Sequence, residues 1–313
     1  MSSKPIIAIK VGDHLIQQWI ANMTPLLPEF SFQSWHDHPA ESAVEYVIGW
    51  CPDARWINSF PNLKAVVSVG SGVDHIANLA ELRANISVIR TVSDDLVQRV
   101  REFAALCVLS WHRQFPKILE HNVSKEWKRF TMETSNAYRV GIMGYGSMGK
   151  ATADTLSSLG YQVSIWAASE RTITEYSYYW GDSQLLQFAD GLDVLICLLP
   201  LTEKTENILS ASLFQRMRPG GCVVNLARGA HLVDNDLFDM LGTGHLSAAY
   251  LDGYRTEPLP SSSPLFSHPN LIVTFHSAGY ISPDIGPRVI AENIRKFDRG
   301  ENVWPMYDRS RGF

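Results

Sequence analysis

Three ionisable side chains with complementary chemistry stand at the ends of apolar runs in the C-terminal half of the chain. Arg228, Glu257 and His276 each come at, or shortly after, the end of a short run that is typical of a buried strand. Ligands of an open parallel sheet bind outside the carboxyl ends of its strands, so we expect these three side chains to lie close together. A planar cation suits a carboxylate, and an imidazole exchanges protons near neutral pH. The set therefore suits acid–base chemistry on a small anion.

A glycine-rich motif separates a predicted strand from a predicted helix. Gly144-Tyr-Gly-Ser-Met-Gly149 has the spacing G-x-G-x-x-G and directly follows the apolar run Val140–Met143. In a dinucleotide site, Gly144 permits the tight turn, Gly146 lets the backbone approach a pyrophosphate, and Gly149 lets the helix pack on the strand. An ordinary strand-to-helix turn is the alternative, but the position of the motif favours a dinucleotide site.

The end of the next predicted strand bears on the choice of cofactor. An NAD site usually carries Asp or Glu there, to bind the ribose hydroxyls. Here the strand ends in Ala168 and Ser169, with Glu170 and Arg171 following. Arg171 could bind a 2′-phosphate, or it could be a solvated loop charge. We favour NADP over NAD.

The order of the predicted elements indicates the fold class. Strand-like runs alternate with helical stretches such as 14–27, 73–82, 149–159 and 235–241 along the whole chain. This alternation predicts an α/β protein with two domains: a Rossmann-type doubly wound parallel sheet and a smaller flavodoxin-like α/β domain. We place the dinucleotide-binding domain at 99–282 and the substrate-binding domain at 1–98 with 283–313, and we expect a linking helix over Val97–Leu119. The expected strands are 6–9, 43–49, 65–69 and 86–90 in the smaller domain, and 139–143, 162–166, 193–199, 221–226, 247–252 and 271–275 in the larger.

The chain resembles the D-isomer-specific 2-hydroxyacid dehydrogenases, and within that family the glyoxylate/hydroxypyruvate reductase A branch. The resemblance covers nearly the whole chain, and its motifs come in the order and context of the family. The segments that carry it are Val69-Gly-Ser-Gly-Val-Asp74, Gly144–Gly149, Leu198-Leu-Pro-Leu-Thr202, Asn225-Leu-Ala-Arg-Gly229, Leu251-Asp252, Glu257-Pro-Leu259, His276-Ser-Ala278 and the ending Asp308-Arg-Ser-Arg-Gly-Phe313.

The resemblance implies a reduction of a small 2-keto acid to the D-2-hydroxy acid with NAD(P)H. Arg228 would bind the substrate carboxylate and polarise the keto group. His276 would be the general acid in reduction and the base in oxidation, and Glu257 would fix its tautomer and favour the protonated ring. Each of these residues taken alone has an ordinary structural explanation. The ordered set favours the catalytic interpretation.

The resemblance also implies residues that bind substrate and cofactor. The amides around Ser71 and Gly72 would bind the substrate carboxylate, although a simple turn is the alternative. Trp50 could form a wall of the pocket or belong to the core. Asp252 would contact the nicotinamide carboxamide or act as a buried capping carboxylate. The cofactor contacts that we expect are Gly144, Gly146, Ser147, Met148, Gly149, Ala168, Arg171, Pro200, Thr205, Ala227 and Asp252.

Composition argues against several other classes of protein. The 313 residues carry a net charge of −5, which predicts no basic face for nucleic acid or an acidic membrane. No run approaches the ~20 apolar residues of a membrane span, no secretory signal is present, and the four cysteines form no Cys-x-x-Cys pair. We expect a cytoplasmic protein without a metal site, because His36 and His38 form a His-x-His without a third ligand nearby.

Several questions stay open at this stage. Arg101 is a cation whose role depends on which way it faces, and the aromatic segment 176–180 has no functional account. The linking helix with its apolar face agrees with the homodimers common in the family. Two alternative functions are a dehydrogenase of another small anion, such as formate or phosphite, and a nicotinamide-sensing binding protein on the same scaffold. Turnover of a keto acid would distinguish the enzyme from the sensor.

Overall fold

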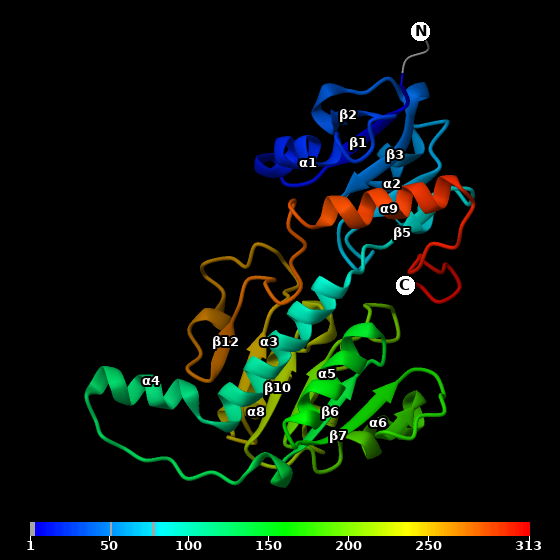
Figure 1. Cartoon of the computed structure of the whole chain (residues 1–313). Helices are drawn as coiled ribbons and strands as arrows, with labels where there is room; N and C mark the ends of the chain where they lie inside the picture. The colour runs from blue at the N-terminus through cyan, green and yellow to red at the C-terminus, as the bar shows by residue number, and fades with distance from the viewer. Residues whose placement is uncertain (1–3, 51, 77–78) are drawn as a thin grey trace. The chain divides into compact units, whose positions relative to one another are not determined.

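The computed structural model of the chain describes residues 4–50, 52–76 and 79–313, so Cys51 lies outside the described residues. The chain divides into two compact units (Figure 1). Unit 1 comprises residues 1–94 and 280–313, and unit 2 comprises residues 95–279. Among the described residues, no helix has both the length and the apolar character that a membrane crossing requires.

Unit 2 is built on a parallel sheet with the strand order β12-β11-β10-β9-β6-β7-β8. The order reverses between β6 and β9, which is the switch point of a doubly wound nucleotide-binding fold. The Rossmann-type prediction is therefore confirmed. The strands are β6 (Arg139–Met143), β7 (Gln162–Ala167), β8 (Ser177–Trp180), β9 (Val194–Cys197), β10 (Gly221–Asn225), β11 (Leu246–Leu251) and β12 (Leu271–Val273).

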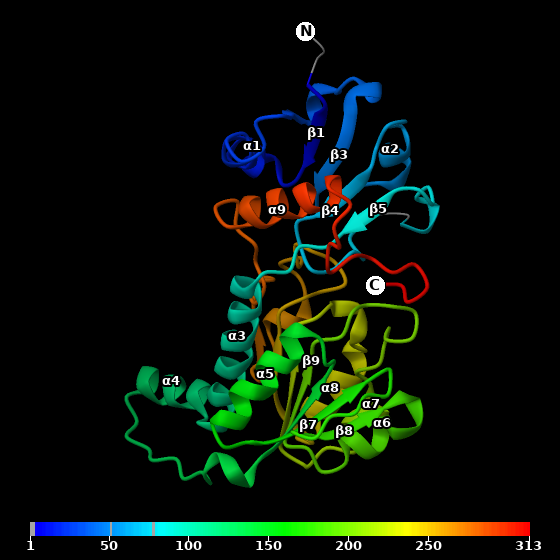
Figure 2. The same cartoon turned by 45° about the vertical axis from the view of Figure 1, so that its right-hand side comes forward.

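Helices cover both faces of this sheet, as Figures 1 and 2 show. Alternate strand residues point to opposite faces, so each face has its own apolar core. On one face α3 (Asp94–His112) and α5 (Ser147–Ser158) pack over β6, β7, β9 and β10. On the other, α6 (Gly181–Ala189), α7 (Ala211–Phe214) and α8 (Asp234–Gly242) pack over the same strands. Two buried faces explain why the strands are nearly continuous apolar runs.

Unit 1 contains a second parallel sheet with the order β2-β1-β3-β4-β5, which confirms the flavodoxin-like prediction. Its strands are β1 (Ile6–Lys10), β2 (Ser31–Ser34), β3 (Val44–Gly49), β4 (Ala65–Ser68) and β5 (Ser87–Ile89). Helices α1 (Ile16–Met23) and α9 (Gly286–Asp298) cover one face, and α2 (Ala54–Asn58) lies on the other. The 3-10 helices of the chain are Asp13–Leu15, Trp35–Asp37, Glu41–Ala43, Leu79–Glu81, Ser135–Ala137, Gly229–His231 and Pro264–Phe266.

The C-terminal segment belongs to unit 1 through specific contacts. The Tyr46 hydroxyl, on β3, donates to the carboxylate of Asp298 at the end of α9, at 2.6 Å. Beyond α9, the amide of Tyr307 donates to the carbonyl of Val88 at 2.9 Å, which attaches the last residues to β5. Residues far apart in sequence therefore complete one sheet-and-helix layer.

Two predicted helices are wrong. Residues 73–76 and 79–82 contain no α-helix, and only Leu79–Glu81 forms a 3-10 turn. Val73, Ile76 and Leu82 are buried at a spacing that imitates one helix face, although an irregular segment supplies them. The linking helix expected over 97–119 is in fact two helices.

The break in that helix falls beside a proline. Helix α3 ends at His112, Gln114 has the left-handed φ of 51°, and α4 (Phe115–Ser124) begins with Pro116 in its first turn. Proline lacks the N–H that a continuous helix would require at this place but is accommodated in a first turn. The chain therefore changes direction at Gln114.

Two strands are absent from the predicted set. Residues 176–180, which we treated as a connection, contain the edge strand β8, and the polar run Ser31–Ser34 forms the edge strand β2. An edge strand needs only one paired side and one packed face, so its sequence is less apolar than that of a central strand. The aromatic side chains of β8 provide the packed face.

Candidate active site

An imidazole and a carboxylate lie in contact at the carboxyl edge of the unit 2 sheet. His276 follows β12, and its Nδ1 is 2.8 Å from Oε2 of Glu257, on the loop after β11. Oε1 of Glu257 accepts a hydrogen bond from the amide of Tyr254 at 2.8 Å. An ionised carboxylate only accepts hydrogen bonds, so Nδ1 of His276 carries a hydrogen. Nε2 is thereby the ring atom suited to exchange a proton with a substrate.

Opposing effects set the pKa of Glu257. Burial raises this pKa, whereas the hydrogen bonds from His276 and the Tyr254 amide and the charges of His276 and Arg228 lower it. The lowering effects prevail, and the pKa lies below its ordinary value of 4.5. The carboxylate is therefore ionised at neutral pH. The side chains of His276 and Glu257 retain 30% and 33% exposure, so a small molecule can reach them.

The third ionisable residue, Arg228, is held by the turn that follows β10. The side chain of Asn225 is fully buried at the end of that strand. Its Nδ2 donates to the carbonyl of Arg228 at 2.9 Å, and its Oδ1 accepts from the amide of Ala227 at 3.2 Å. We did not select Asn225 from the sequence. Its position as a polar residue at the end of an apolar run was the signal that could have identified it.

Close backbone packing joins the loops that carry the three residues. A Cβ on Gly229 would lie 2.2 Å from the carbonyl carbon of Tyr254, so only glycine fits beside that loop. The charge of Arg228 is near enough to lower the pKa of Glu257, as the smallest of the lowering effects. The structure thus brings Arg228, Glu257 and His276 to one edge of the unit 2 sheet.

Asp252 positions the segment that carries His276. This carboxylate is 2% exposed and accepts hydrogen bonds from the Thr274 hydroxyl at 2.6 Å and from the amides of Ser277 and Ala278 at 2.8 and 2.9 Å. The amide of His276 donates to the carbonyl of Asp252 at 2.9 Å. His276 itself has the left-handed φ of 53°. This conformation is unfavourable for a residue with a Cβ and persists only where the surrounding structure stabilises it. Asp252 therefore has the capping role that we considered for it.

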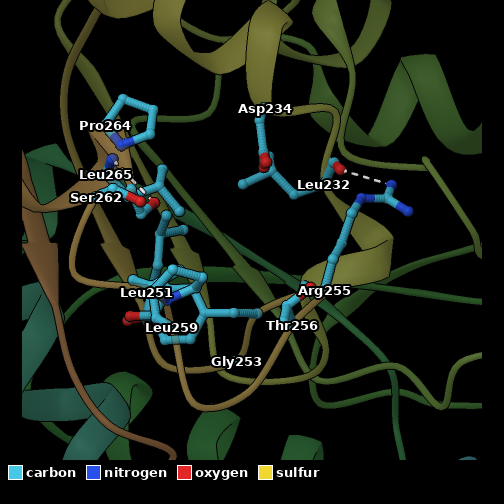
Figure 3. Close-up of a pocket in the computed structure, with 14 residues that line it drawn as sticks. Leu232, Asp234, Leu251, Gly253, Arg255, Thr256, Leu259, Ser262, Pro264 and Leu265 are labelled. Atoms are coloured by element: carbon cyan, nitrogen blue, oxygen red, sulfur yellow. Dashed lines mark hydrogen bonds between the residues drawn. The ribbon is translucent and has the colours of Figure 1, made fainter.

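A cavity of about 320 Å³ is lined by residues of the loop after β11 and of the segment that leads into α8 (Figure 3). Arg255 donates to the carbonyl of Leu232 at 3.0 Å across one side, and the carboxyl group of Asp234 is directed toward the interior (Figure 3). Burial raises the pKa of Asp234, and the charge of Arg255 partly offsets this. None of the residues described around the cavity belongs to the set of three ionisable residues, so we do not assign the substrate to it.

The glycine motif has the geometry of a phosphate-binding turn. Gly144 has φ of +106°, and its amide donates to the carbonyl of Trp166 on β7 at 2.7 Å. A Cβ on Gly149 would lie 2.0 Å from the carbonyl oxygen of Gly144, so the helix could not approach the strand with any other residue. Gly146 caps α5, and a Cβ there would meet no described atom within 4 Å. The turn therefore leaves room for a bound pyrophosphate at the start of α5.

The loop after β7 holds Arg171 against the same turn. Nη1 of Arg171 donates to the carbonyl of Tyr145 at 3.1 Å, and the Tyr178 hydroxyl donates to the carbonyl of Ser169 at 2.7 Å. The rings of Tyr145 and Tyr178 are 6.1 Å apart and edge-on. Tyr178 of β8 thus supports the loop after β7. In this loop Ala168 occupies the position at which an NAD site usually carries a carboxylate for the ribose.

The other expected cofactor residues surround the switch point of the sheet. Ser147 and Met148 form the exposed and half-buried first turn of α5, and Ala227 follows β10. After β9, the buried hydroxyl of Thr205 donates to the carbonyl of Pro200 at 2.8 Å. This bond shapes the 200–205 loop, so Thr205 has a structural role within it.

In unit 1, protein donors fix the carbonyl groups of the expected carboxylate-binding loop. Nε of Arg90 donates to the carbonyl of Ser71 at 2.5 Å, and the buried hydroxyl of Ser68 lies 2.9 Å from the carbonyl of Gly72. Among the described residues, no hydrogen bond is donated by the amides of Ser71 and Gly72. Two neighbouring N–H groups are thereby available to an anion.

Comparison with known proteins decides the family. The model of the NAD-binding domain of D-isomer-specific 2-hydroxyacid dehydrogenases matches residues 105–278. The chain is 33% identical over 305 residues to a glyoxylate/hydroxypyruvate reductase A of Serratia proteamaculans, covering 95% of this chain and 96% of that one. The chain belongs to the D-isomer-specific 2-hydroxyacid dehydrogenase family. As a member of this family, it is a nicotinamide-dependent oxidoreductase, and the sensing alternative is not favoured.

Solved structures of this dehydrogenase family share the fold of the whole chain. One is a D-isomer-specific 2-hydroxyacid dehydrogenase of Xanthobacter autotrophicus in complex with NADPH and MES, with TM-score 0.91, 28% identity and coverage of 99% of this chain and all of that one. Another is an NADPH-dependent glyoxylate/hydroxypyruvate reductase of Sinorhizobium meliloti in complex with NADP and sulfate, with TM-score 0.89, 26% identity and the same coverage.

His36 and Arg101, whose roles the sequence left open, each have a partner among the described residues. Nε2 of His36 lies 2.8 Å from Asp13, and no group of three potential metal ligands occurs within residues 4–50, 52–76 and 79–313. Burial raises the pKa of Asp154 on α5, whereas hydrogen bonds from Lys150 and Tyr176 and the charges of Lys150 and Arg101 lower it. The guanidinium of Arg101 donates a hydrogen bond to the side chain of Gln98, one turn earlier on α3.

Proposed function

We propose that the protein reduces a small 2-keto acid, of the glyoxylate or hydroxypyruvate type, to the D-2-hydroxy acid with NADPH. The observation that carries this proposal is the His276–Glu257 pair within the electrostatic reach of Arg228. The relatives named above are described as glyoxylate/hydroxypyruvate reductases, which supports the same class of substrate.

His276, Glu257 and Arg228 have different roles in the reduction. The bound nicotinamide supplies a hydride to the carbonyl carbon. Nε2 of His276 donates the proton that the carbonyl oxygen takes up, and Glu257 holds the ring through Nδ1 and stabilises its charged form. Arg228 binds the substrate carboxylate and stabilises the developing charge on the oxygen.

We propose that the amides of Ser71 and Gly72 also bind the substrate carboxylate. The support is that their neighbouring carbonyl groups are already bonded inside the protein, while the two N–H groups are available. Backbone N–H groups of this kind recognise a carboxylate without a further charged side chain. Trp50, which follows β3, would form a wall of the same subsite.

The preference for NADPH rests on the loop after β7. Ala168 offers no carboxylate to repel a 2′-phosphate, and the guanidinium of Arg171 is held beside the glycine turn. We expect Arg171→Ala to raise KM for NADPH by about tenfold, the scale of one charge-assisted contact, and to leave KM for NADH almost unchanged. Arg216→Ala, at another exposed arginine, is the matched control. Equal effects on both cofactors would remove Arg171 from the 2′-phosphate site.

A kinetic panel tests the proposed function. The purified protein is assayed with glyoxylate, hydroxypyruvate, pyruvate and larger 2-keto acids, each with NADPH and NADH, and with formate and phosphite in the presence of NADP and NAD. Turnover of the small keto acids supports the proposal. Oxidation of formate or phosphite would favour the alternative dehydrogenase, and tight NADPH binding without any turnover would favour the sensor.

We also propose a cytoplasmic homodimer. Helices α3 and α4 expose an apolar surface, and α4 with the segment after it stands away from the sheet of unit 2 in both views (Figures 1 and 2). A second copy would bury this surface, which is formed by Leu106, Leu109, Phe115, Ile118, Leu119, Val123 and Trp127. The free, buried thiols of Cys107, Cys197 and Cys222 agree with a reducing compartment.

A further inference from the structure

The indole of Trp50 is stacked on an imidazole from another part of unit 1. Trp50 follows β3, and the ring centroids of Trp50 and His75 are 4.0 Å apart with an interplanar angle of 14°. Such a parallel stack buries one face of the indole and restricts the side chain to one rotamer. The position of Trp50 therefore depends on a residue that we did not select from the sequence.

A second constraint on Trp50 comes from Gly70, at the edge of the indole. A Cβ on Gly70 would lie 2.8 Å from Cζ3 of the indole, closer than real Cβ contacts allow. Gly70 does not have the left-handed φ that would itself require glycine. The residue is therefore a glycine because the edge of the indole occupies the space where a side chain would be, so His75 contacts a face of the indole and Gly70 contacts its edge.

A buried hydroxyl fixes His75 in turn. Oγ of Ser68, which is fully buried, lies 3.1 Å from the amide of Gly70, 2.9 Å from the carbonyl groups of Gly70 and Gly72, and 3.2 Å from Nε2 of His75. A hydroxyl has one hydrogen and two lone pairs. The carbonyl groups take the hydrogen and the Gly70 amide fills one lone pair. The remaining lone pair accepts a hydrogen from Nε2 of His75, which assigns the tautomer of the ring.

The same hydroxyl thus organises two parts of one subsite. Ser68 positions the loop whose Ser71 and Gly72 amides we assign to the substrate carboxylate, and it positions the ring on which Trp50 rests. The wall and the anion-binding amides are held in fixed register because one buried atom contacts both supports. A displacement of His75 would let the Trp50 indole move but would leave the amides of Ser71 and Gly72 in place.

We propose that His75 is a positioning residue that fixes Trp50 as a rigid wall beside the 70–72 loop and so limits the keto acid to a small substituent on its keto carbon. The inference rests on the proposed function of the site. It makes substrate size depend on the contacts of Trp50 with His75 at one face and with Gly70 at one edge. His75 itself does not touch the substrate in this account.

The central experiment compares His75→Ala with His75→Phe. Alanine removes the stacked ring, whereas phenylalanine keeps a flat ring without the bond to Ser68. We expect His75→Ala to reduce the preference for glyoxylate over 2-ketobutyrate, measured as the ratio of kcat/KM values, by on the order of tenfold, the usual effect of one methylene in a defined pocket. His75→Phe keeps the ratio near that of the wild type, even if KM rises for both acids because the loop loosens.

A double-mutant cycle with Trp50→Ala shows whether His75 acts through the indole. Trp50→Ala alone relaxes the size preference, and His75→Ala adds little in that background, because residues in contact are not additive. An equal effect of His75→Ala in the presence and absence of Trp50 would overturn the proposal. So would an unchanged ratio in His75→Ala.

A readout that is independent of turnover separates this proposal from the proposed function. In protein labelled with 5-fluorotryptophan, the ¹⁹F resonance of Trp50 is identified by its loss in Trp50→Phe. We expect the line to shift and sharpen in His75→Ala and to stay near its original position in His75→Phe. An unmoved line in His75→Ala refutes the positioning role. Failure of the wild type to reduce any 2-keto acid, together with a shifted line, would refute only the proposed function.

Discussion

At the scale of single residues, the site depends on a charged pair whose geometry is set by hydrogen bonds. Glu257 orients His276 through Nδ1, and the amide of Tyr254 orients Glu257. Because an imidazole can present either nitrogen, the partner of one nitrogen decides which nitrogen meets the substrate. The chemistry of His276 therefore cannot be separated from the position of Glu257.

The first residue-scale prediction concerns His276 and Arg228. We expect His276→Ala and Arg228→Ala each to lower the reduction rate at least ~100-fold, the usual scale for an acid–base or oxyanion-stabilising group. Arg228→Lys keeps the charge but loses the planar fork, so it should recover only part of the rate. Steady-state kinetics with glyoxylate and NADPH measure this, and near-normal rates in either alanine variant would remove that residue from its assigned role.

The second residue-scale prediction concerns the pH dependence of Glu257. Its pKa in the folded protein lies below the ordinary 4.5. A carboxyl group with a lowered pKa contributes stability above its ordinary pKa and loses that contribution as pH falls through the folded value. We expect Glu257→Gln to unfold at lower urea concentration than the wild type at pH 7, and the difference to shrink below about pH 4. A difference that is constant from pH 3 to 7 would show that the charge of Glu257 is not responsible.

At the scale of elements, the ends of parallel strands place the functional groups. The sheet brings the segments after β10, β11 and β12 to one edge, and each segment is then shaped by a buried polar side chain. Asn225 shapes the turn before Arg228, and Asp252 shapes the turn around His276. Buried polar groups of this kind are costly unless every hydrogen bond is made, so they specify one loop conformation.

The element-scale prediction concerns Asp252. Asn in its place keeps one acceptor oxygen but turns an amide N–H toward a backbone N–H of the 274–278 segment, where no bond is possible. We expect Asp252→Asn to lower the free energy of unfolding by about 1–3 kcal/mol and kcat by at least tenfold. Denaturant unfolding and steady-state kinetics measure the two effects. Thr274→Val, which removes only the hydroxyl contact, should have the smaller effect in both assays.

At the scale of the whole molecule, distant parts of the chain complete unit 1, whereas unit 2 is one continuous segment. Unit 1 requires residues 280–313 to cover its sheet, and unit 2 is inserted between the two parts of unit 1. The surface of α3 and α4 indicates a further level of assembly, because no other part of unit 2 covers its exposed apolar side chains. Val123 and Trp127 are 85% and 92% exposed, which is unusual for residues of these types.

The whole-molecule prediction concerns this surface. We expect Val123→Asp to convert the proposed homodimer to a monomer, because in the proposed interface the charge would have to lose its water. Light scattering after size-exclusion chromatography measures the mass. Leu186→Asp, on the exposed side of α6, is the control and should remain dimeric. A wild-type protein that is monomeric at micromolar concentration would contradict the proposal.

Much of the architecture could be predicted from local sequence. Strands β6, β9 and β10 are buried on both faces and are therefore continuous apolar runs, which the sequence shows directly. The predicted strands near 162, 247 and 271 are less fully buried but are also rich in apolar residues. Edge strands β2 and β8 lack that signature, and the buried residues between β4 and β5 imitate a helix period without forming one. Local pattern fails where an edge strand is polar or aromatic in sequence, and where an irregular segment buries apolar residues at helical spacing.

The sequence by itself determined the residue types of the site, because a G-x-G-x-x-G turn and an Arg, Glu and His at strand ends are local features of the chain. Only the tertiary structure decided how these residues are supported. Asn225, Asp252, Ser68 and His75 act through hydrogen bonds and stacking with residues brought close by folding. The physical reason is that chemistry depends on the kind of group, which is written in the sequence, while its orientation depends on neighbours that only the fold supplies.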